Sequence, residues 1–261
     1  MIRLNKVSKQ FRTGVFALTD ISFEVEKGEF VFLVGPTGSG KTTIFRLITR
    51  EALPTVGEVI VDNWDVTKLP NNKISHLRKK IGVVFQDLKL LMDRTIFENI
   101  ILPLEVSGID SITATKIAEG IMEKVGILDH KDKFPIQLSG GELQRAAIAR
   151  ALTLEPDILL ADEPTGNLDQ ATAKEIVKLL SDINEKGTTI IMATHNEEVV
   201  KALSKRVIAL DKGKLVGISG KKSKTHPEHS EKKSAIISIE DKKPEEDSKQ
   251  AEKKKEQDED F

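Results

Sequence analysis

A glycine-rich loop followed by a lysine and a threonine is the stretch of this chain whose residue types and spacing most clearly carry chemistry. It reads Gly35-Pro36-Thr37-Gly38-Ser39-Gly40-Lys41-Thr42 and fits the pattern G-x-x-x-x-G-K-[ST] without a mismatch. Its glycines let successive backbone N–H groups curl round a phosphate, and a following helix presents the positive end of its dipole to the same anion. Lys41 would reach the outer phosphates and Thr42 would ligate magnesium, with Thr43 beside them.

The residues on either side of this loop have the patterns of a buried strand and an amphipathic helix. Phe30–Val34 is a continuous apolar run, as expected of a parallel strand that is buried on both faces. After the loop, Ile44, Leu47 and Ile48 fall on one helical face. Because strand, loop and helix follow in the required order, a glycine-rich turn that matches by chance is the weaker interpretation.

Two carboxylates, Asp162 and Glu163, follow a second apolar run, Ile158–Ala161. Side chains at the carboxyl end of a buried parallel strand lie where α/β sheets bind ligands. Asp162 would hold magnesium together with Thr42, and Glu163 would accept a proton from a water that attacks the terminal phosphate. The alternative is a solvent-exposed acidic turn, which the preceding buried strand disfavours.

A second candidate for phosphate binding begins at Ser139. Ser139 and Glu142 have the capping-box spacing at the start of an alanine-rich helix that runs to Leu154. Between them, Gly140 and Gly141 lower helix stability but leave backbone N–H groups open to an anion. Because a cap explains Ser139 and Glu142 but not the two glycines, we interpret the stretch as a second phosphate-binding element.

Three single residues are weaker candidates on chemistry alone. Phe11 stands in a polar loop, where its ring would either stack on an adenine or pack in the core. Gln86 ends the short apolar strand Ile81–Phe85, and His195 follows the predicted strand Thr188–Ala193. Without further context, a histidine at such a position is packed or exposed as often as it is catalytic.

The composition bounds the class of protein. A chain of 261 residues with 39% hydrophobic content is long enough for one large or two modest domains. Its 40 basic and 41 acidic residues nearly cancel, so no global field favours nucleic acid or an anionic membrane surface. The absence of cysteine excludes disulfides and thiolate chemistry. No signal core or membrane span is recognisable, and we therefore expect a soluble, cytoplasmic protein.

Pattern changes along the chain suggest its organisation. Residues 2–7, 19–26 and 56–62 alternate apolar and polar side chains, which predicts half-buried antiparallel strands, with a turn at Asn63-Trp64-Asp65. Residues 88–155 are predicted to be mainly helical and inserted into an α/β core. A helix over Ala171–Glu185 and a closing hairpin over residues 206–218 follow. From residue 219 to 261 the composition predicts a disordered charged tail.

The chain resembles a known family, the ATP-binding subunits of ABC-type systems, over about residues 1–218. Six motifs carry the resemblance together: Gly35–Thr42, Gln86, Leu138–Glu142, Ile158–Glu163, Asp169 and His195. It implies an α/β P-loop NTPase fold with an antiparallel β subdomain and an inserted α-helical subdomain. It also implies an ATPase that uses ATP and Mg²⁺.

By that resemblance, two copies of the chain would close head to tail on two ATP molecules. The phosphate loop of one copy would then face Ser139–Glu142 of the other, and the loop with Asp169 would join the two sites. Asp162 would be the metal ligand and Glu163 the catalytic base. His195 would sense the terminal phosphate. Gln86 would link metal, water and a membrane partner.

Within the family, Ala161–Asp169 resembles the branch that contains the lipoprotein-release, macrolide-exporter and cell-division ATPases. The segments Phe85–Thr95 and Phe134–Gly141 are most similar to the cell-division subunits of the FtsE type. The implied partner is an integral membrane protein similar to FtsX, whose cytoplasmic helix residues 87–95 would help to receive. The implied role is control of peptidoglycan hydrolysis, at the inner face of the cell membrane and without nucleic acid.

Two alternatives stay open at this point. The chain could serve lipoprotein release or macrolide-type export with the same enzymatic parts. It could also be a nucleotide-dependent scaffold with little turnover, although Glu163 argues against this because a scaffold needs no base.

Overall fold

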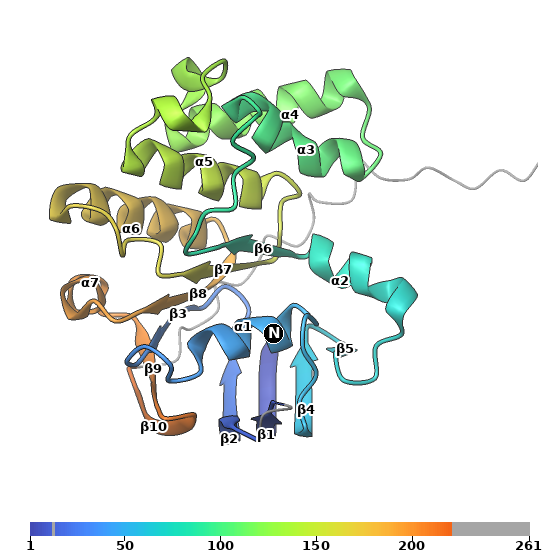
Figure 1. Ribbon diagram of the computed structural model, residues 1–261, viewed down its shortest axis with the longest axis vertical. Helices are drawn as coiled ribbons and strands as arrows, with labels where there is room; N and C mark the ends of the chain where they lie inside the picture. The colour runs from blue at the N-terminus through green and yellow to red at the C-terminus, as the bar shows by residue number, and fades with distance from the viewer. Residues whose placement is uncertain (12–13, 221–261) are drawn as a thin grey trace, which may run out of the picture. The chain divides into compact units, whose positions relative to one another are not determined.

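The computed structural model describes residues 1–11 and 14–220, whose strands form two sheets (Figure 1). A four-stranded sheet has the order β2-β1-β4-β5, and a six-stranded sheet has the order β10-β9-β3-β8-β7-β6. The strands are β1 Ile2–Gln10, β2 Phe16–Val25, β3 Phe30–Val34, β4 Val56–Val61, β5 Trp64–Asp65, β6 Ile81–Val84, β7 Ile158–Asp162, β8 Thr189–Thr194, β9 Arg206–Asp211 and β10 Lys214–Ser219.

Seven α-helices and three short 3₁₀ turns complete the described part of the chain. The helices are α1 Lys41–Ile48, α2 Ile74–Lys79, α3 Ile96–Val106, α4 Ser111–Val125, α5 Gly140–Leu152, α6 Gln170–Glu185 and α7 Glu197–Leu203. The 3₁₀ turns are Asn71–Lys73, Leu128–His130 and Pro135–Gln137. None of these helices is long and apolar enough to cross a bilayer.

The six-stranded sheet positions the phosphate loop. β3 pairs in parallel with β8 on one side and β9 on the other, while β10 closes the edge as an antiparallel hairpin with β9. Val31 and Leu33 point into one core cluster, and Phe30 and Phe32 point into the cluster on the opposite face. Burial on both faces explains the continuous apolar run of β3 and fixes the point at which the loop leaves the sheet.

The antiparallel sheet agrees with the prediction, with one correction. β1 pairs antiparallel with both β2 and β4, and Ile2, Leu4 and Val7 of β1 are buried. The predicted turn at Asn63-Trp64-Asp65 is confirmed only for Asn63, because Trp64 and Asp65 form β5 and pair with Val61 and Ile60 of β4. A strand of two residues depends on its partner for its backbone hydrogen bonds, and no local periodicity reveals it.

The inserted helical segment contains α3, α4 and α5, which lie together at the top of Figure 1. Their apolar residues share one core cluster with α6 and one face of the six-stranded sheet. Residues 88–95 contain no helix, which corrects the start of the predicted helical segment. The fold is therefore the expected α/β core with an antiparallel sheet and a helical insertion.

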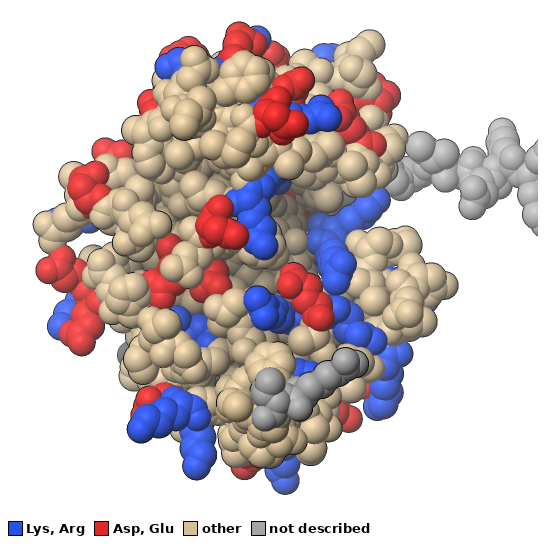
Figure 2. All heavy atoms as spheres, viewed as in Figure 1, with Lys and Arg blue, Asp and Glu red and all other residues tan. Residues whose placement is uncertain are grey.

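Most of the predicted charged tail, residues 219–261, lies outside the described residues. Ser219 is an exception and a correction, because it belongs to β10 and pairs with Val207 of β9. On the face shown in Figure 2, acidic and basic side chains are interspersed, in keeping with the nearly balanced composition.

Candidate active site

Four neighbouring parallel strands each deliver a candidate residue at their carboxyl ends. In sheet order, β3 leads into the phosphate loop, β8 into His195, β7 into Asp162 and Glu163, and β6 toward Gln86. Such a row of strand ends is the usual ligand edge of an α/β sheet. The sheet thus gathers residues that are up to 160 positions apart in the sequence (35 to 195).

The phosphate loop spans the gap between β3 and α1, and Lys41 lies across it. Lys41 Nζ donates hydrogen bonds to the carbonyl oxygens of Gly35, at 2.7 Å, and Pro36, at 3.2 Å. The same ammonium lies 3.6 Å from Glu163 Oε1. Its charge therefore stands inside the loop, in reach of any anion that the loop encloses.

Gly35 allows the loop to pass close to β9. Its φ of +153° is accessible mainly to glycine, and a Cβ at this position would lie 2.2 Å from the carbonyl oxygen of Leu210. It would also lie 2.6 Å from Ser39 Oγ, a buried hydroxyl without a hydrogen-bond partner among the described residues. The Ser39 hydroxyl is thus a buried polar group that no described residue satisfies.

Thr42 and Asp162 meet at the predicted metal position. Thr42 Oγ1 donates a hydrogen bond of 2.9 Å to Asp162 Oδ2. Burial raises the pKa of the Asp162 carboxyl above its ordinary value; the hydrogen bond from Thr42 opposes this shift, and the charge of Glu163 adds to it.

The donor set at this position fits magnesium with a nucleotide. No group of three or more His, Asp or Glu side chains that would hold a metal unaided occurs in residues 1–11 and 14–220. Magnesium prefers oxygen ligands and is commonly bound by one or two carboxylates together with substrate phosphates. The Thr42 hydroxyl at the start of α1 and the Asp162 carboxylate at the end of β7, 2.9 Å apart, agree with this mode of binding.

Glu163 is held in place from several sides. Its backbone has a φ of +49°, unusual for a residue other than glycine, and its N–H donates to the carbonyl oxygen of Ala193 at 2.9 Å. His195 Nδ1 lies 2.7 Å from Glu163 Oε2, while Lys41 approaches the other carboxylate oxygen. The carboxylate is nearly buried, whereas the imidazole is exposed. Glu163 therefore joins the phosphate loop and His195 in one polar cluster.

Gln86 shares a hollow with the predicted metal residues. This hollow has a volume of about 470 Å³ and is lined by Thr42, Asp162 and Gln86. Basic side chains of Arg46 and Lys89 also line it. The structure therefore brings Gln86 to the same hollow as the Thr42–Asp162 pair.

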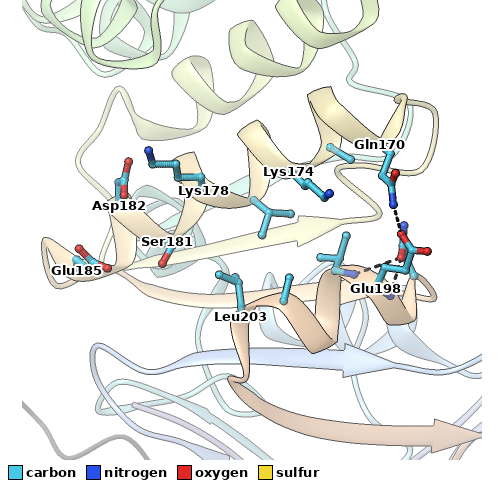
Figure 3. A pocket seen from close by; sticks show the side chains of 13 residues that line it. Gln170, Lys174, Lys178, Ser181, Asp182, Glu185, Glu198 and Leu203 are labelled. Atoms are coloured by element: carbon cyan, nitrogen blue, oxygen red, sulfur yellow. Dashed lines mark hydrogen bonds between the residues drawn. The ribbon is translucent and has the colours of Figure 1, made fainter.

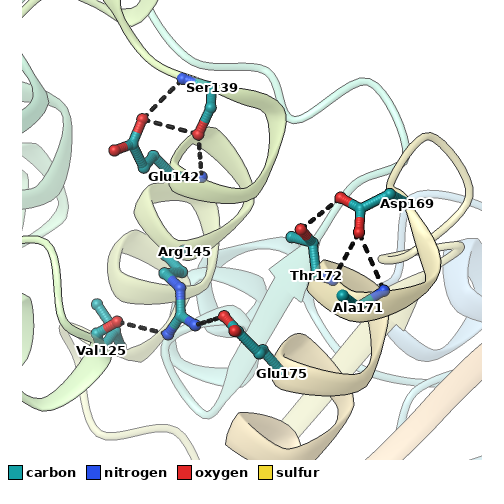
Figure 4. Close-up of polar contacts among 8 residues, drawn as sticks. All are labelled: Val125, Ser139, Glu142, Arg145, Asp169, Ala171, Thr172 and Glu175. Atoms are coloured by element: carbon teal, nitrogen blue, oxygen red, sulfur yellow. Dashed lines mark hydrogen bonds and ion pairs between the residues drawn. The ribbon is translucent and has the colours of Figure 1, made fainter.

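The second phosphate candidate forms the expected helix start (Figure 4). Glu142 N donates to Ser139 Oγ, and Glu142 Oε2 accepts from the Ser139 backbone N–H at 2.7 Å. That backbone bond, followed by the Ser139 hydroxyl, lowers the pKa of the Glu142 carboxyl. Ser139 and Gly140 are exposed, so the N-terminus of α5 is accessible from outside the chain.

The two glycines also have a reason within the chain. A Cβ on Gly141 would lie 2.5 Å from Thr172 Cγ2, and one on Gly140 would lie 3.2 Å from Leu168 Cδ2. Asp169 caps α6 here, accepting from the N–H groups of Ala171 and Thr172 (Figure 4). The glycine pair therefore allows α5 to pack closely on the start of α6, a contact that the sequence did not reveal.

Within one chain the candidates fall into separate groups. The phosphate loop, Asp162, Glu163 and His195 come together, whereas Ser139–Glu142 do not line the hollow that holds Thr42 and Asp162. Phe11 stands apart at the end of β1; it is 40% exposed and lies under Lys9 Nζ, 5.6 Å from the ring centroid. The alternative in which Phe11 packs in the core is therefore wrong, and the exposed ring is accessible to another molecule.

Sequence reasoning missed two polar side chains that hold the segment after Gln86. Asn99, fully buried in α3, accepts from Leu91 N at 2.7 Å and donates to the carbonyl oxygens of Leu91 and Thr95. Arg150 of α5 donates to two carbonyl groups at the start of the same segment. An asparagine within the apolar run Ile96–Ile101 was the available signal for the first.

A further hollow, of about 380 Å³, lies between α6 and α7 (Figure 3). Val177, Val199 and Leu203 contribute apolar surface to it, and Gln170 donates to Glu198 at one end. None of the predicted site residues lines it, so the candidate active site is the polar edge of the sheet and not this hollow.

Known proteins are similar to this chain in sequence and in fold. A family model described as "ABC transporter" matches residues 18–166. The cell division ATP-binding protein FtsE of Bacillus subtilis is 45% identical over 216 residues, which cover 83% of this chain and 95% of that protein. FtsE of Escherichia coli is 42% identical over 217 residues, covering 83% of this chain and 98% of the relative.

A solved structure is also similar to this chain. A dimeric ATP-binding cassette in a post-hydrolysis state, bound to ADP and Pi, is 35% identical and superposes with a TM-score of 0.77. The match covers 84% of this chain and 98% of that one. The chain therefore belongs to the ABC transporter family, as an FtsE-like ATP-binding subunit that hydrolyses ATP.

Proposed function

We propose that two copies of this chain close on two MgATP molecules and drive an integral membrane protein similar to FtsX, thereby regulating peptidoglycan hydrolysis during cell division. The observation that carries the proposal is the cluster of Lys41, Glu163 and His195 beside the Thr42–Asp162 pair. The similarity to cell division ATP-binding proteins supplies the biological setting.

The residues of the sheet edge take complementary parts in hydrolysis. Lys41 and the backbone N–H groups of the phosphate loop bind the outer phosphates. Thr42, Asp162 and Gln86 would hold Mg²⁺, which when bound would neutralise charge on the phosphate oxygens. Glu163 accepts a proton from the attacking water, and its nearly buried carboxylate keeps the accepting oxygen fixed. His195 Nδ1 lies 2.7 Å from that carboxylate and would orient it and sense the terminal phosphate of a bound nucleotide.

The second half of each site comes from another copy of the chain. Ser139 and Gly140 are exposed at the N-terminus of α5, where the helix dipole and free N–H groups favour an anion. Asp169 lies next to this surface, and Phe11 offers an exposed ring for the adenine. A relative solved as a dimer with ADP and Pi supports this arrangement.

The membrane partner would dock beside Gln86, on the segment of residues 87–95. Leu88 and Leu90 pack against the core, but Leu91 and Met92 are exposed, Met92 by 58%. Core packing and a docking role are therefore divided between different residues of one segment. This contact would hold the chain at the inner face of the cell membrane.

Co-purification tests the partner. We expect the full chain to recover an FtsX-like membrane protein from detergent-solubilised native membranes, and we expect Met92→Asp to lose most of it because a charge replaces apolar contact surface. Val106→Asp is the matched control, since Val106 of α3 is 80% exposed but outside the segment. Recovery of a lipoprotein-release or export complex instead would contradict the division role.

A further inference from the structure

The backbone directly after Gln86 has an unusual conformation. Leu88 and Lys89 have φ values of +55° and +50°, and neither is glycine. Two consecutive residues of this kind are strained, and such strain persists only where surrounding contacts determine it. The structure shows which contact does so here.

The guanidinium of Arg150 donates hydrogen bonds to the carbonyl oxygens of both strained residues. Arg150 Nη2 donates to the carbonyl oxygen of Leu88 and Nη1 to that of Lys89, each at 2.7 Å. The planar fork of an arginine suits two neighbouring acceptors, which a lysine ammonium matches less well. Burial lowers the pKa of Arg150, and no carboxylate within residues 1–11 and 14–220 forms an ion pair with it. The two carbonyl groups are therefore its main partners.

The hydrogen bonds of Arg150 join helix α5 to the segment that follows Gln86. Arg150 is on α5, the same helix whose N-cap is Ser139 and whose start carries the proposed second phosphate-binding element. The segment beyond Lys89 is anchored separately, by Asn99 of α3 to Leu91. Arg150 of α5 therefore holds the start of the segment, next to Gln86, while Asn99 of α3 holds its middle.

We infer that Arg150 is a positioning residue, which sets the place of Gln86 at the Thr42–Asp162 pair from the helix that carries Ser139. The inference rests on the proposed role of Gln86 as a link to metal and water. Phe85, the residue before Gln86, lines both the hollow that contains Arg150 and the hollow that contains Asp162. One polar contact thus connects the second phosphate element to the metal side of the site.

A double-mutant cycle tests this inference in the full-length protein. ATPase activity is measured against Mg²⁺ concentration for Gln86→Ala, Arg150→Ala and the double variant. We expect each single variant to lower kcat and to raise the Mg²⁺ concentration for half-maximal activity. The double variant should resemble Gln86→Ala within about twofold, because Arg150 acts through Gln86. Losses that multiply would overturn the inference.

Two further variants keep the test decisive. Arg150→Lys keeps the positive charge but loses the planar guanidinium that donates to both carbonyl groups. If Arg150→Ala does not fold, the double-mutant cycle of Arg150→Lys with Gln86→Ala replaces it as the test. Arg145→Ala is the matched control, because Arg145 on the same helix donates to the carbonyl oxygen of Val125 and pairs with Glu175 (Figure 4). Its effect should multiply with that of Gln86→Ala. An unchanged Gln86→Ala enzyme would instead refute the role of Gln86 itself.

Discussion

Replacement of Glu163 with Gln is expected to lower the turnover of ATP by about 10² to 10⁴, the usual contribution of a positioned general base. Glutamine keeps the shape and the contact with His195 but accepts no proton from water. Lys41, Thr42 and Asp162 are untouched, so ATP and magnesium should still bind. Binding without turnover is the signature that separates a base from a structural carboxylate.

Single-turnover kinetics and equilibrium ATP binding measure the two halves of this prediction. Glu197→Gln is a suitable control, since Glu197 is an exposed residue of α7 that pairs with Lys201. It should leave turnover unchanged. Turnover of Glu163→Gln at the rate of the unmodified chain would remove Glu163 from the role of base and would favour a different proton acceptor.

Replacement of Gly35 with Ala is expected to weaken ATP binding by about tenfold or more and to lower the melting temperature. The added Cβ would lie 2.2 Å from the carbonyl oxygen of Leu210, a backbone atom of β9 that is held in the sheet. The loop must therefore shift. Strain of about 1–3 kcal/mol at one residue would lower the affinity for ATP by about 5-fold to about 150-fold.

Calorimetric ATP binding and thermal unfolding check the Gly35→Ala variant together. Gly120→Ala makes the same chemical change inside α4, where a Cβ would meet no atom within 4 Å. It should stabilise the protein by about 1 kcal/mol, because alanine is the better helix former. Normal ATP affinity in Gly35→Ala would show that the loop is not confined by β9.

The sequence predicted those parts of the fold whose burial leaves a local pattern, such as a strand that is buried on both faces of its sheet. β3 occupies the predicted residues, because a strand buried on both faces leaves a continuous apolar run. β5 was missed, since Trp64 and Asp65 take their strand conformation from pairing with β4. Residues 88–95 were included at the start of the segment predicted to be mainly helical, but they contain no helix, and Arg150 and Asn99 hold their backbone by hydrogen bonds.

For the site, residue types predicted which strand ends carry chemistry, while the geometry between them required the folded chain. The order of four parallel strands places Gln86, Asp162, Glu163 and His195 along one edge, and no local pattern encodes that order. The role of Arg150 was not predicted, because its partners are backbone carbonyl groups, which every residue has and which no sequence pattern distinguishes. The packing of Gly141 on Thr172 was hidden for the same reason.

The central claim is that ATP joins the phosphate loop of one chain to Ser139 of another. Sedimentation equilibrium of the Glu163→Gln variant tests it most directly, because that variant should bind ATP without consuming it. We predict the mass of one chain without nucleotide and twice that mass with MgATP. Adding Ser139→Arg should return the protein to the mass of one chain while ATP still binds. A dimer that forms regardless of ATP, or that tolerates Ser139→Arg, would contradict the composite site.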